Sequence, residues 1–586
     1  MKSISLLIIF VLAKVAVLWG RPIDWLSWTV AAYFWQDVLI AALFGLVEWL
    51  ATRSRVTSRT SVLGYGAVAI YAALNIPVAI VLSTPLTWPM LRATRGTLAD
   101  SILLYVTPTN SLLVLLTLGA AAVLPRILTR VPETIRPFGA VLALLIVAIG
   151  PAAAARVDTI GLHRNVVFAL AASTLPHINA RADAGEWTTP PFELHEIDDL
   201  SHLRGIAAGH NVVLVSLEST AAQYLRLYGG KDDVMPNLDL LAQRAVVFDN
   251  AYAAYPESIK GLFSILCSTF PAFDTTPEMY ERSPCRSIAT VLAKAGYSTA
   301  LFHSGRFAYL GMQSIISGRG YQILQDAGDI GGNYESSFGV DEPSTVARML
   351  SWIDSRPAGE RFFLTYLPIA GHHPYETPGH GPFEDADEIG RYRNALHYAD
   401  ESLGTLIAGL RARDLDQRTI WIVLGDHGEA FGQHDGNYGH TFFLYDENVH
   451  VPFVIAAPGI LNRQQRSRTT VSLVDTAPTI LDLLGIPDPP AYQGHSALDG
   501  RGQMALFFTD YSLALVGLRD GRWKFVHELE SGRSKLFDVD RDGGERTDVS
   551  SMQPSRVAAY ERTLRAWSAA QKSYLFSSQQ PGRIPP

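Results

Sequence analysis

The sequence predicts a bundle of five membrane-spanning helices followed by an α/β domain with a mostly parallel sheet flanked by helices. Long apolar runs fill the first third of the 586 residues, and only 18% of the chain is charged. From Asn211 onward, short β-rich runs alternate with helical patterns, which is typical of a parallel sheet covered on both faces. A chain of this length holds more than one core, so we expect at least two domains.

Five apolar segments near the N-terminus have the length of membrane-spanning helices. Each is close to the roughly 20 residues that cross a bilayer as a helix. They occupy residues 4–20, 25–51, 61–83, 101–124 and 135–155. Pro108 interrupts the fourth segment, and a cleaved signal peptide is the alternative for residues 1–20. The sequence therefore predicts that this part of the chain lies in a lipid bilayer.

The arginines between these segments predict which side of the membrane each connection faces. Short connections rich in Lys and Arg stay in the cytoplasm. The second and fourth connections hold Arg53, Arg55 and Arg59, and Arg126, Arg130 and Arg136. We therefore expect these two connections inside and everything after residue 155 outside. This orientation predicts a multi-pass protein of a bacterial-type inner membrane, with its soluble domain on the periplasmic or outer side.

Composition divides the chain into four predicted parts. We expect a transmembrane bundle over 1–157, a linker over 158–208, a catalytic domain over 209–505 and a C-terminal subdomain with a tail over 506–586. Prolines and charges characterise the linker. Within it, residues 166–175 can form a short helix that lies on the membrane surface.

Charge and cysteine content limit the remaining classes. A net charge of −8 gives no electrostatic basis for binding nucleic acid. Cys267 and Cys285 are the only two cysteines, which excludes a cysteine-rich metal site. They can form one disulfide if their domain is exported, and the alternative is two separate buried thiols. Nothing in the sequence predicts an oligomeric state.

Metal-binding side chains follow two of the predicted strands. Glu218 comes shortly after the strand at 211–215, and Asp426 and His427 directly follow the strand at 419–424. Parallel strands end at one edge of the sheet, where open α/β sheets build their sites. Two carboxylates and one imidazole suit one divalent cation, which can be Zn²⁺, Mn²⁺, Mg²⁺ or Ca²⁺. The structural alternatives are a helix cap for Glu218 and a capped turn with a satisfied histidine for the Asp-His pair.

Motifs spaced over residues 209–550 resemble the sulfatase branch of the alkaline phosphatase superfamily. They lie at 235–242, 248–252, 295–299, 373–375, 398–404, 425–429, 451–455 and 474–479. Residues 521–525 and 536–539 resemble the C-terminal hairpin region of sulfatases. The resemblance implies the α/β fold of that superfamily with a small C-terminal antiparallel sheet, and a metal-dependent transferase or ester hydrolase.

The membrane segments add a second resemblance, to the lipoteichoic acid synthases and the lipid A phosphoethanolamine transferases. Residues 216–220 are also similar to the synthases, whereas many sulfatases have two aspartates there. This resemblance implies a cell-envelope lipid or glycan as substrate. One departure weakens the glycerol phosphate polymerase hypothesis. The synthases carry a Trp-x-Arg that holds glycerol phosphate, and this chain has Ala-Tyr-Leu-Gly at 308–311.

Ser258 is the predicted nucleophile and a fourth metal contact. It lies between a turn at Pro256 and a helical pattern, and a helix N-terminus offers free N–H groups and positive potential. The resemblance gives it the place of the catalytic threonine of the transferases. The Cys/Ser-x-Pro-x-Arg motif that precedes formylglycine is absent, so no formylglycine is expected. The alternative is that Ser258 is only a helix N-cap.

Four further residues are predicted to contact the substrate. The resemblance makes His373 a substrate-binding histidine and His440 a catalytic one, and either can protonate a leaving alkoxide. Lys260 is a point cation that can neutralise oxyanion charge. Tyr309 stands in the region of the Trp-x-Arg. Three weaker candidates, which we expect to be packed or solvated, are His303, His372 and His434.

These residues predict an enzyme in which Ser258 attacks a phosphoester. A hydroxyl of a lipid or glycan, or water, then resolves the phosphoseryl intermediate. The first alternative is a sulfatase-type hydrolase of sulfate or phosphate esters that works without formylglycine. The second is a non-catalytic membrane receptor that kept the fold, against which the intact metal-binding set argues.

Overall fold

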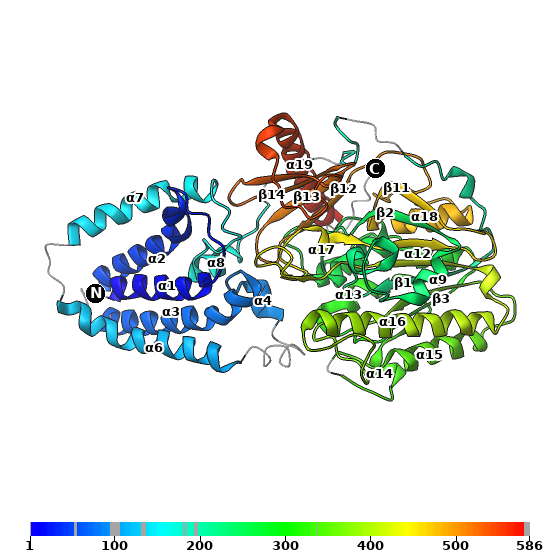
Figure 1. Cartoon of the computed structure of the whole chain (residues 1–586), viewed down its shortest axis with the longest axis horizontal. Coiled ribbons are helices and arrows are strands. Elements are labelled where there is room, and N and C mark those ends of the chain that lie inside the picture. The colour runs from blue at the N-terminus through cyan, green and yellow to red at the C-terminus, as the bar shows by residue number, and fades with distance from the viewer. Residues whose placement is uncertain are drawn as a thin grey trace.

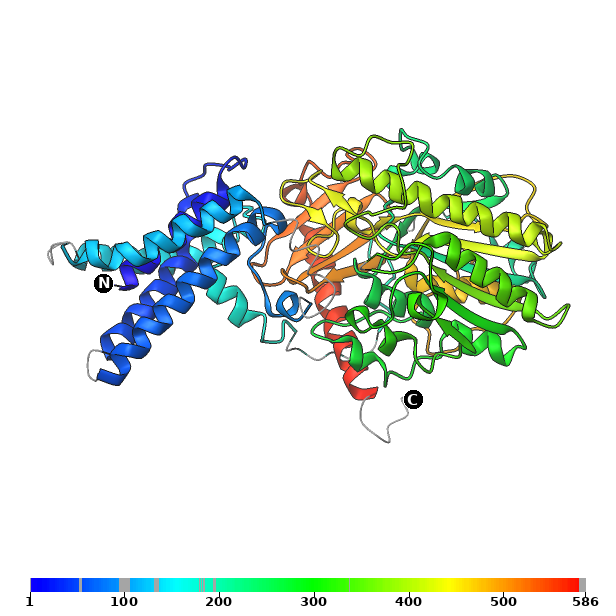
Figure 2. The ribbon, with the colours of Figure 1, turned by 90° about the horizontal axis from the view of Figure 1, so that it is seen from below.

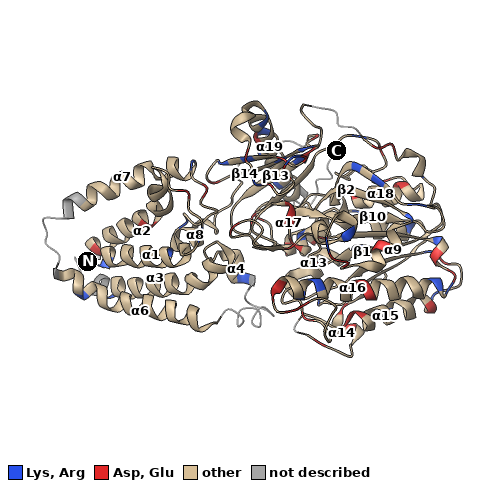
Figure 3. Ribbon diagram, in the orientation of Figure 1, with Lys and Arg blue, Asp and Glu red and all other residues tan. Residues whose placement is uncertain are grey.

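A computed structural model gives the fold and describes residues 2–51, 55–93, 106–130, 136–178, 180, 182, 185–192, 197–336 and 338–578. The chain forms an N-terminal helical bundle beside a larger α/β domain (Figures 1 and 2). Lys, Arg, Asp and Glu residues are concentrated on the α/β domain and are scarce along the bundle helices (Figure 3). This difference is what the apolar first third of the sequence predicts.

In the part of the bundle that the structure describes, there are five long helices and a short one. They are α1 (Lys2–Leu18), α2 (Thr29–Ala51), α3 (Arg55–Leu82), α4 (Trp88–Ala93), α6 (Pro108–Ile127) and α7 (Arg136–Ala154). Three stretches are long and apolar enough to cross a membrane: Thr29–Leu50, Arg59–Leu82 and Pro108–Ile127. The helix α1 has 17 residues, and the apolar part of α7, Gly139–Ala154, is also shorter. Three candidate spans are thus confirmed, and five spans remain a prediction.

The fourth predicted segment starts later than expected, because Pro108 begins α6 instead of interrupting it. Proline suits the first helical turn, where its missing N–H would have no partner. Thr107 caps this helix, since its side chain accepts a hydrogen bond from the N–H of Asn110. Residues 101–105 of the predicted segment lie outside the described residues.

The long helices alternate in direction, so that the ends of the bundle differ (Figure 1). The end of α2 and the start of α3 lie far from the α/β domain, as do the end of α6 and the start of α7. The arginine-rich second and fourth connections join these helix ends. Those connections therefore lie at the end of the bundle that is far from the α/β domain, and the orientation across a membrane stays a prediction.

Reporter fusions test this orientation. We expect an exported reporter to be active when fused after Arg156 and inactive when fused after Arg55 or Arg130, because Arg-rich short connections are retained in the cytoplasm. A cytoplasmic reporter should give the reverse pattern. An exported reporter that is active at either of the two inside positions would contradict the orientation.

The predicted linker contains the expected short helix, α8 (Val166–Ala172). Its cap is Asn165, whose side chain accepts a hydrogen bond from the N–H of Val167. The helix contacts α2 and α3, and Ala169 is fully buried. This part of the linker therefore packs on the bundle. Its predicted place on a membrane surface stays a prediction.

A nine-stranded sheet forms the centre of the α/β domain. Its order is β11 (Gln465–Ser472), β2 (Ala245–Tyr252), β10 (Phe453–Ala456), β6 (Thr419–Gly425), β1 (Asn211–Leu217), β5 (Phe362–Leu367), β3 (Ser298–His303) and β4 (Ile323–Gln325), and β9 (His450–Val451) pairs with β2. All neighbours run parallel except those paired with β10 and β9. Every residue of β1 and β6 is buried, as expected of strands covered on both faces. The predicted mostly parallel sheet is confirmed.

Helices cover both faces of the sheet. Val212 and Leu214 of β1 face one apolar core, and Val213 and Val215 face the other. The first core includes side chains from α10 (Ser258–Cys267), α12 (Ile288–Lys294) and α18 (Thr476–Leu484); the second includes side chains from α9 (Pro236–Ala242), α15 (Glu342–Ser355) and α16 (Glu388–Arg411). Shorter elements are α11 (Pro277–Tyr280), α13 (Met312–Ile316), α14 (Ala327–Ile330), α17 (Asp446–Val449), β7 (Ala430–Phe431) and β8 (Tyr438–Gly439).

The small antiparallel sheet implied by the resemblance is also present. Its strands are β12 (Ala505–Thr509), β13 (Leu515–Asp520), β14 (Trp523–Glu528) and β15 (Ser534–Asp538). The helix α19 (Pro554–Ser578) packs against it, with Tyr560 and Trp567 in the same apolar cluster as Leu518 and Phe525. The fold thus combines a helical region with a sulfatase-like α/β domain.

The two cysteines form a disulfide between the end of α10 and the segment before α12. The Cα atoms of Cys267 and Cys285 are 5.5 Å apart, and the bond closes a loop with a sequence separation of 18. A disulfide that closes a loop of this length restricts the unfolded chain and so stabilises the folded state by about 3 kcal/mol. We therefore expect replacement of both cysteines by serine to lower the free energy of unfolding by about that amount. Peptide mass spectrometry under non-reducing conditions should find the linked pair, and two free thiols in protein isolated from the membrane would contradict it.

Candidate active site

The two predicted metal-binding strands are neighbours. β1 and β6 pair in parallel, with Leu217 opposite Gly425, so that Glu218 and Asp426 are the next residues beyond the last pair. The N–H of Asp426 donates to the carbonyl of Leu217 at 3.1 Å, which joins the two strand ends. The prediction that these side chains meet at the carboxyl edge of the sheet is confirmed.

Glu218, Asp426 and His427 form a compact buried cluster. Their candidate ligand atoms all lie within 4.8 Å of one another. His427 Nε2 is 3.6 Å from Glu218 Oε1 and 3.5 Å from Asp426 Oδ2. The other ring nitrogen, Nδ1, lies 2.9 Å from the carbonyl of Gly428, which can only accept a hydrogen bond. The proton therefore belongs on Nδ1, and the Nε2 lone pair faces the two carboxylates.

The electrostatics of this cluster fit a bound cation. Burial, and then the neighbouring Asp426 carboxylate, raise the pKa of Glu218 well above its usual value. In the described part of the chain, neither carboxylate forms an ion pair with a lysine or arginine. Two buried carboxylates without a cationic partner are costly. A divalent ion would remove that cost, and Glu218, Asp426 and His427 provide the ligands for it.

Ser219 holds both carboxylates of the cluster in place, and it was not predicted from the sequence. Its N–H donates to Asp426 Oδ1 at 2.9 Å, and its hydroxyl donates to Glu218 Oε1 at 3.0 Å. Its φ of 53° lies in the left-handed region, which is uncommon outside glycine and worth notice at a site. A serine directly after a candidate ligand was the available signal.

Ser258 lies at the N-terminus of α10 with its hydroxyl directed at the cluster. Its Oγ is 2.9 Å from Glu218 Oε2 and 3.1 Å from His427 Nε2. The N-cap of this helix is Glu257, whose carboxylate accepts a hydrogen bond from the N–H of Lys260 at 3.2 Å. The alternative that Ser258 is only the N-cap is therefore wrong, because the preceding residue has that role.

His440 also reaches the cluster, held by a residue that the sequence analysis missed. The ring centroids of His440 and His427 are 4.1 Å apart. Glu429 accepts from His440 Nδ1 at 2.6 Å and from the hydroxyl of Tyr375 at 2.8 Å. Burial lowers the pKa of His440, but the Glu429 carboxylate more than offsets this, so the pKa is raised. Glu429 ends the 425–429 motif, and its place in that motif was the available signal.

Lys260 follows in the first turn of α10 and has a buried acidic partner. Its Nζ lies 3.0 Å from Asp510 Oδ1 and 4.5 Å from the ring centre of Tyr255. Burial lowers the pKa of Lys260, but Asp510 more than offsets this, so that its pKa is raised and the side chain stays charged. Asp510 was not predicted from the sequence, in which it lies 250 residues from Lys260.

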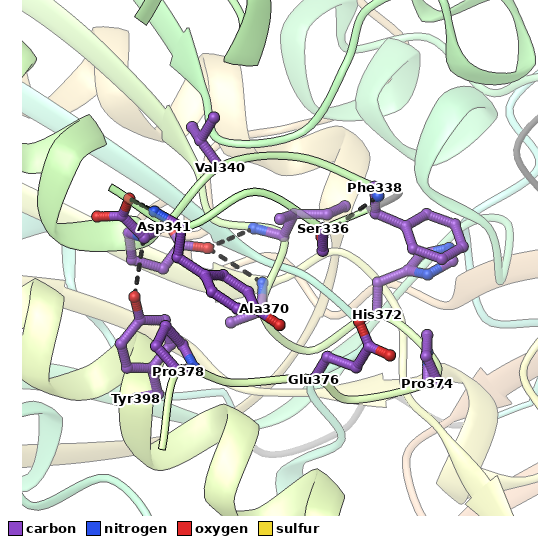
Figure 4. A pocket seen from close by; sticks show the side chains of 13 residues that line it. Ser336, Phe338, Val340, Asp341, Ala370, His372, Pro374, Glu376, Pro378 and Tyr398 are labelled. Atoms are coloured by element: carbon purple, nitrogen blue, oxygen red, sulfur yellow. Dashed lines mark hydrogen bonds between the residues drawn. The ribbon is translucent and has the colours of Figure 1, made fainter. Parts of the chain in front are cut away.

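Two adjacent histidines lie at the start of the motif at 373–375, of which His373 is the first residue and His372 the residue before it. His372 packs against Phe338, with ring centroids 4.4 Å apart, and lies 5.8 Å from Tyr309. Figure 4 shows His372 and Phe338 side by side in a small pocket. Burial lowers the pKa of His372 to about 4, so its ring is neutral. Burial also lowers the pKa of His373, whose ring lies 5.4 Å from that of Tyr375. His372, which the sequence ranked lower, is thus the one that contacts Tyr309.

The two other histidines have structural partners, as expected. His303 Nδ1 donates to the carbonyl of Leu367 at 2.9 Å. His434 bonds to Glu447 Oε1 at 2.6 Å and stacks on Tyr445. Both side chains therefore support the loops around the site.

A cavity of about 830 Å³ lies between the first turn of α10 and α4. From the α/β domain it is lined by Glu257, Lys260, Arg306, Tyr309 and Asp510, from α4 by Trp88 and Arg92, and from the linker by His177. Tyr309, predicted to bind substrate, thus lines the cavity that the first turn of α10 also lines. The cavity is in the range typical of small-molecule sites.

Comparisons with known proteins give the class of this site. A sequence model of the sulfatase family matches residues 210–486, and one for the N-sulphoglucosamine sulphohydrolase C-terminal region matches residues 433–565. Arylsulfatase K of Mus musculus is 30% identical over 253 residues, which are 38% of this chain and 45% of that protein. The alignment therefore spans less than half of that relative. Arylsulfatase K of Canis lupus familiaris is 25% identical over 62% of this chain and 84% of its own length.

Bacterial relatives agree with this class. The lipoteichoic acid synthase-like YvgJ of Bacillus subtilis (strain 168) is 24% identical, over 59% of each chain. The crystal structure of the lipoteichoic acid synthase LtaP of Listeria monocytogenes has the same fold, with a TM-score of 0.55 at 18% identity, covering 65% of this chain and 96% of that one. The chain belongs to the sulfatase family of the alkaline phosphatase superfamily, as its motifs predicted.

Proposed function

We propose that this chain is a membrane-anchored enzyme that transfers or hydrolyses a phospho-group through a covalent adduct on Ser258. One observation carries the proposal. Ser258 Oγ lies at hydrogen-bond distance from both Glu218 and His427, at the N-terminus of a helix of 10 residues. A hydroxyl next to a metal-binding cluster and free N–H groups has the environment of an activated nucleophile.

Each residue of the cluster then has a role in the two steps. In the first, Ser258 Oγ, whose hydroxyl proton has passed to solvent, forms a bond to phosphorus while the bond to the leaving oxygen breaks. His440, held by Glu429 at 2.6 Å, gives its proton to the leaving alkoxide. In the second, a hydroxyl or water attacks phosphorus and gives its proton to His440, while the bond from phosphorus to Ser258 Oγ breaks and the serine alkoxide is released. A divalent ion held by Glu218, Asp426, His427 and Ser258 would lower the pKa of the serine hydroxyl and withdraw charge from the phosphoryl oxygens.

The substrate class we propose is a lipid or a glycan of the cell envelope. Three candidate spans support a place in the membrane, and the cavity lined by Glu257 and Lys260 lies between the bundle and the α/β domain. We propose the cytoplasmic membrane, with the α/β domain on the outer side. The side chains of Trp88 and Arg92 on α4 provide an apolar and a cationic group on the bundle side of the cavity.

A sulfatase-type hydrolase is the second candidate. The match of residues 433–565 to the N-sulphoglucosamine sulphohydrolase C-terminal region and the arylsulfatase K relatives favour it. The residues after Ser258 oppose it, because Ile259 and Lys260 stand where the formylglycine motif has x-Pro. A sulfatase of this type would have to use the unmodified serine.

A pair of chromogenic esters separates the two candidates. We expect the purified full chain to hydrolyse an aryl phosphodiester, and Ser258→Ala to remove that activity, while an aryl sulfate is not turned over. Turnover of the sulfate ester alone would replace the proposed function by the sulfatase. Turnover of neither ester by metal-loaded protein would favour the non-catalytic receptor.

A further inference from the structure

The loop between β12 and β13 connects the helical bundle to the candidate active site. It contains three consecutive residues, Asp510, Tyr511 and Ser512, which contact different parts of the molecule. Asp510 contacts the first turn of α10, and the two residues after it contact the bundle. The loop also lines the large cavity through Asp510 and Tyr511.

Asp510 orders three segments of the cavity wall. One carboxylate oxygen accepts from Lys260 Nζ at 3.0 Å and from the hydroxyl of Tyr255 at 2.8 Å. The other accepts from the N–H of Asp274 at 2.7 Å. The side chains of Lys260 and Asp510 are only 9% and 8% exposed. A buried ion pair of this kind fixes the ammonium group in one place, because release would leave an unpaired charge in the interior.

Ser512 is held from the bundle side. Its carbonyl accepts from Arg164 Nη1 at 2.9 Å, and its hydroxyl contacts both Arg164 and Thr84. The carbonyl of Tyr511 accepts from the hydroxyl of Thr87 at 3.1 Å. Thr84 and Thr87 lie between α3 and α4, so the loop is attached to the end of a candidate span.

These contacts continue into the bundle. Next to Arg164, the side chain of Asn165 donates to Asp37 Oδ1 at 2.7 Å, and Asp37 pairs with Lys14 at 2.5 Å. The side chains of Lys14 and Asp37 are buried at 9% and 2% exposure. Charged groups among spanning helices are costly and mark a functional arrangement. A polar chain therefore runs from α1 and α2 through residues 164–165 to the 510–512 loop.

A second contact between the bundle and the α/β domain does not involve this loop. Arg533 Nη1 pairs with Asp158 Oδ1 at 2.7 Å and donates to the carbonyl of Val157 at 3.0 Å. Removing the hydroxyl of Ser512 therefore leaves the two parts attached. Any effect of that substitution on Lys260 then arises from the loop between β12 and β13.

We propose that Asp510 and Ser512 are positioning residues through which the membrane bundle holds Lys260 two residues from the nucleophile. The inference rests on the proposed function and on the prediction from the sequence that Lys260 neutralises charge on the transferred group. It assigns the bundle a role beyond anchoring. The bundle keeps the active-site ammonium in the place where negative charge develops on the phosphoryl oxygens.

Acetylation of lysines in the full-length protein tests the geometry without any substrate. A hydrogen bond to a charged group shifts the equilibrium between the paired and the released side chain by about tenfold to a hundredfold. We therefore expect Asp510→Asn to raise the acetylation rate of Lys260 by about tenfold, and Ser512→Ala or Thr84→Val by a smaller factor of about three. Lys524 is the internal standard, because it is also buried and paired with a carboxylate, Asp446, at 2.6 Å.

Ser534→Ala is the matched control. Ser534 lies in the same small sheet and its hydroxyl bonds to His527 Nδ1 at 2.8 Å. It should leave the ratio of Lys260 to Lys524 acetylation at the wild-type value. A wild-type ratio in both Ser512→Ala and Thr84→Val would overturn the link to the bundle. A wild-type ratio in folded Asp510→Asn would overturn the role of Asp510.

Kinetics on the aryl phosphodiester give a second readout that a merely structural role would not move. A residue that acts only in the transition state lowers kcat and kcat/KM equally. We expect Asp510→Asn to lower kcat by about tenfold or more with KM unchanged. Lys260→Ala and the double variant should have the same rate, because Asp510 acts through Lys260. Additive losses would overturn the inference. If wild-type protein turns over no phosphodiester, the proposed function fails, and the acetylation ratios still decide the role of the loop.

Discussion

Ser258→Ala should abolish turnover and leave the metal bound. Alanine cannot form the phosphoseryl ester, and loss of a nucleophile lowers kcat by factors on the order of 10³ to 10⁶. Glu218, Asp426 and His427 remain as ligands, since they lie within 4.8 Å of one another without the serine. Ser258→Thr should keep part of the activity, because it preserves a hydroxyl at the same helix terminus. Steady-state kinetics and metal content of the same preparations check both statements.

Ser264→Ala is the matched control for the nucleophile. Ser264 is buried in the same helix, and its hydroxyl donates to the carbonyl of Lys260 at 3.3 Å, away from the cluster. We expect wild-type kcat for it. A Ser258→Ala enzyme with wild-type turnover would contradict the assignment. Thr220, bonded to the carbonyl of Glu218 at 3.1 Å, and Ser219 would then be the hydroxyls to replace.

Asp426→Asn and His427→Ala should each remove both the metal and the activity. Three protein side chains and a serine hydroxyl hold the proposed ion, so loss of one strong ligand should lower its affinity by about a hundredfold or more. The fold should survive, because the strands that carry these residues are held by the register from Asn211 to Leu217. Elemental analysis and circular dichroism of the full-length variants measure metal and fold separately.

His397→Ala provides the control for histidine loss. His397 lies on α16 and bonds to the carbonyl of Val234 at 3.0 Å, outside the cluster. It should keep wild-type metal content. Full metal occupancy in both Asp426→Asn and His427→Ala would show that the ion binds elsewhere. In wild-type protein, a chelator should remove activity, and one equivalent of the right divalent ion should restore it.

The strands and the metal cluster could be predicted from the sequence because each is a local pattern. A buried apolar run that ends in Glu218, and another that ends in Asp426 and His427, place ligands at strand ends by chain order alone. The loop that follows could not be predicted in this way. Glu429 and His440 are brought together by the turn of β7 and β8, and no periodicity specifies that turn.

Contacts between residues far apart in the sequence, and the choice between adjacent residues, could not be predicted for a different reason. Asp510 pairs with Lys260 across 250 residues, and one sequence contains no signal for such a pairing. Whether His372 or His373 contacts Tyr309 depends on which of the two rings the turn before Pro374 directs toward it. A shift of one residue along the chain would exchange the two rings. Helix ends were displaced where a cap decided them, as at Thr107 and Glu257.

Mass spectrometry of the full-length protein, after incubation with membrane phospholipids labelled in the headgroup, tests most directly whether Ser258 carries the transferred group. We expect an adduct whose mass is that of the transferred phospho-group, located on the peptide that contains Ser258, and absent from Ser258→Ala. Its lifetime should shorten when an acceptor hydroxyl is added. Product formation without an adduct on that peptide, or with an adduct on Ser219 or Thr220, would show that Ser258 is not the nucleophile.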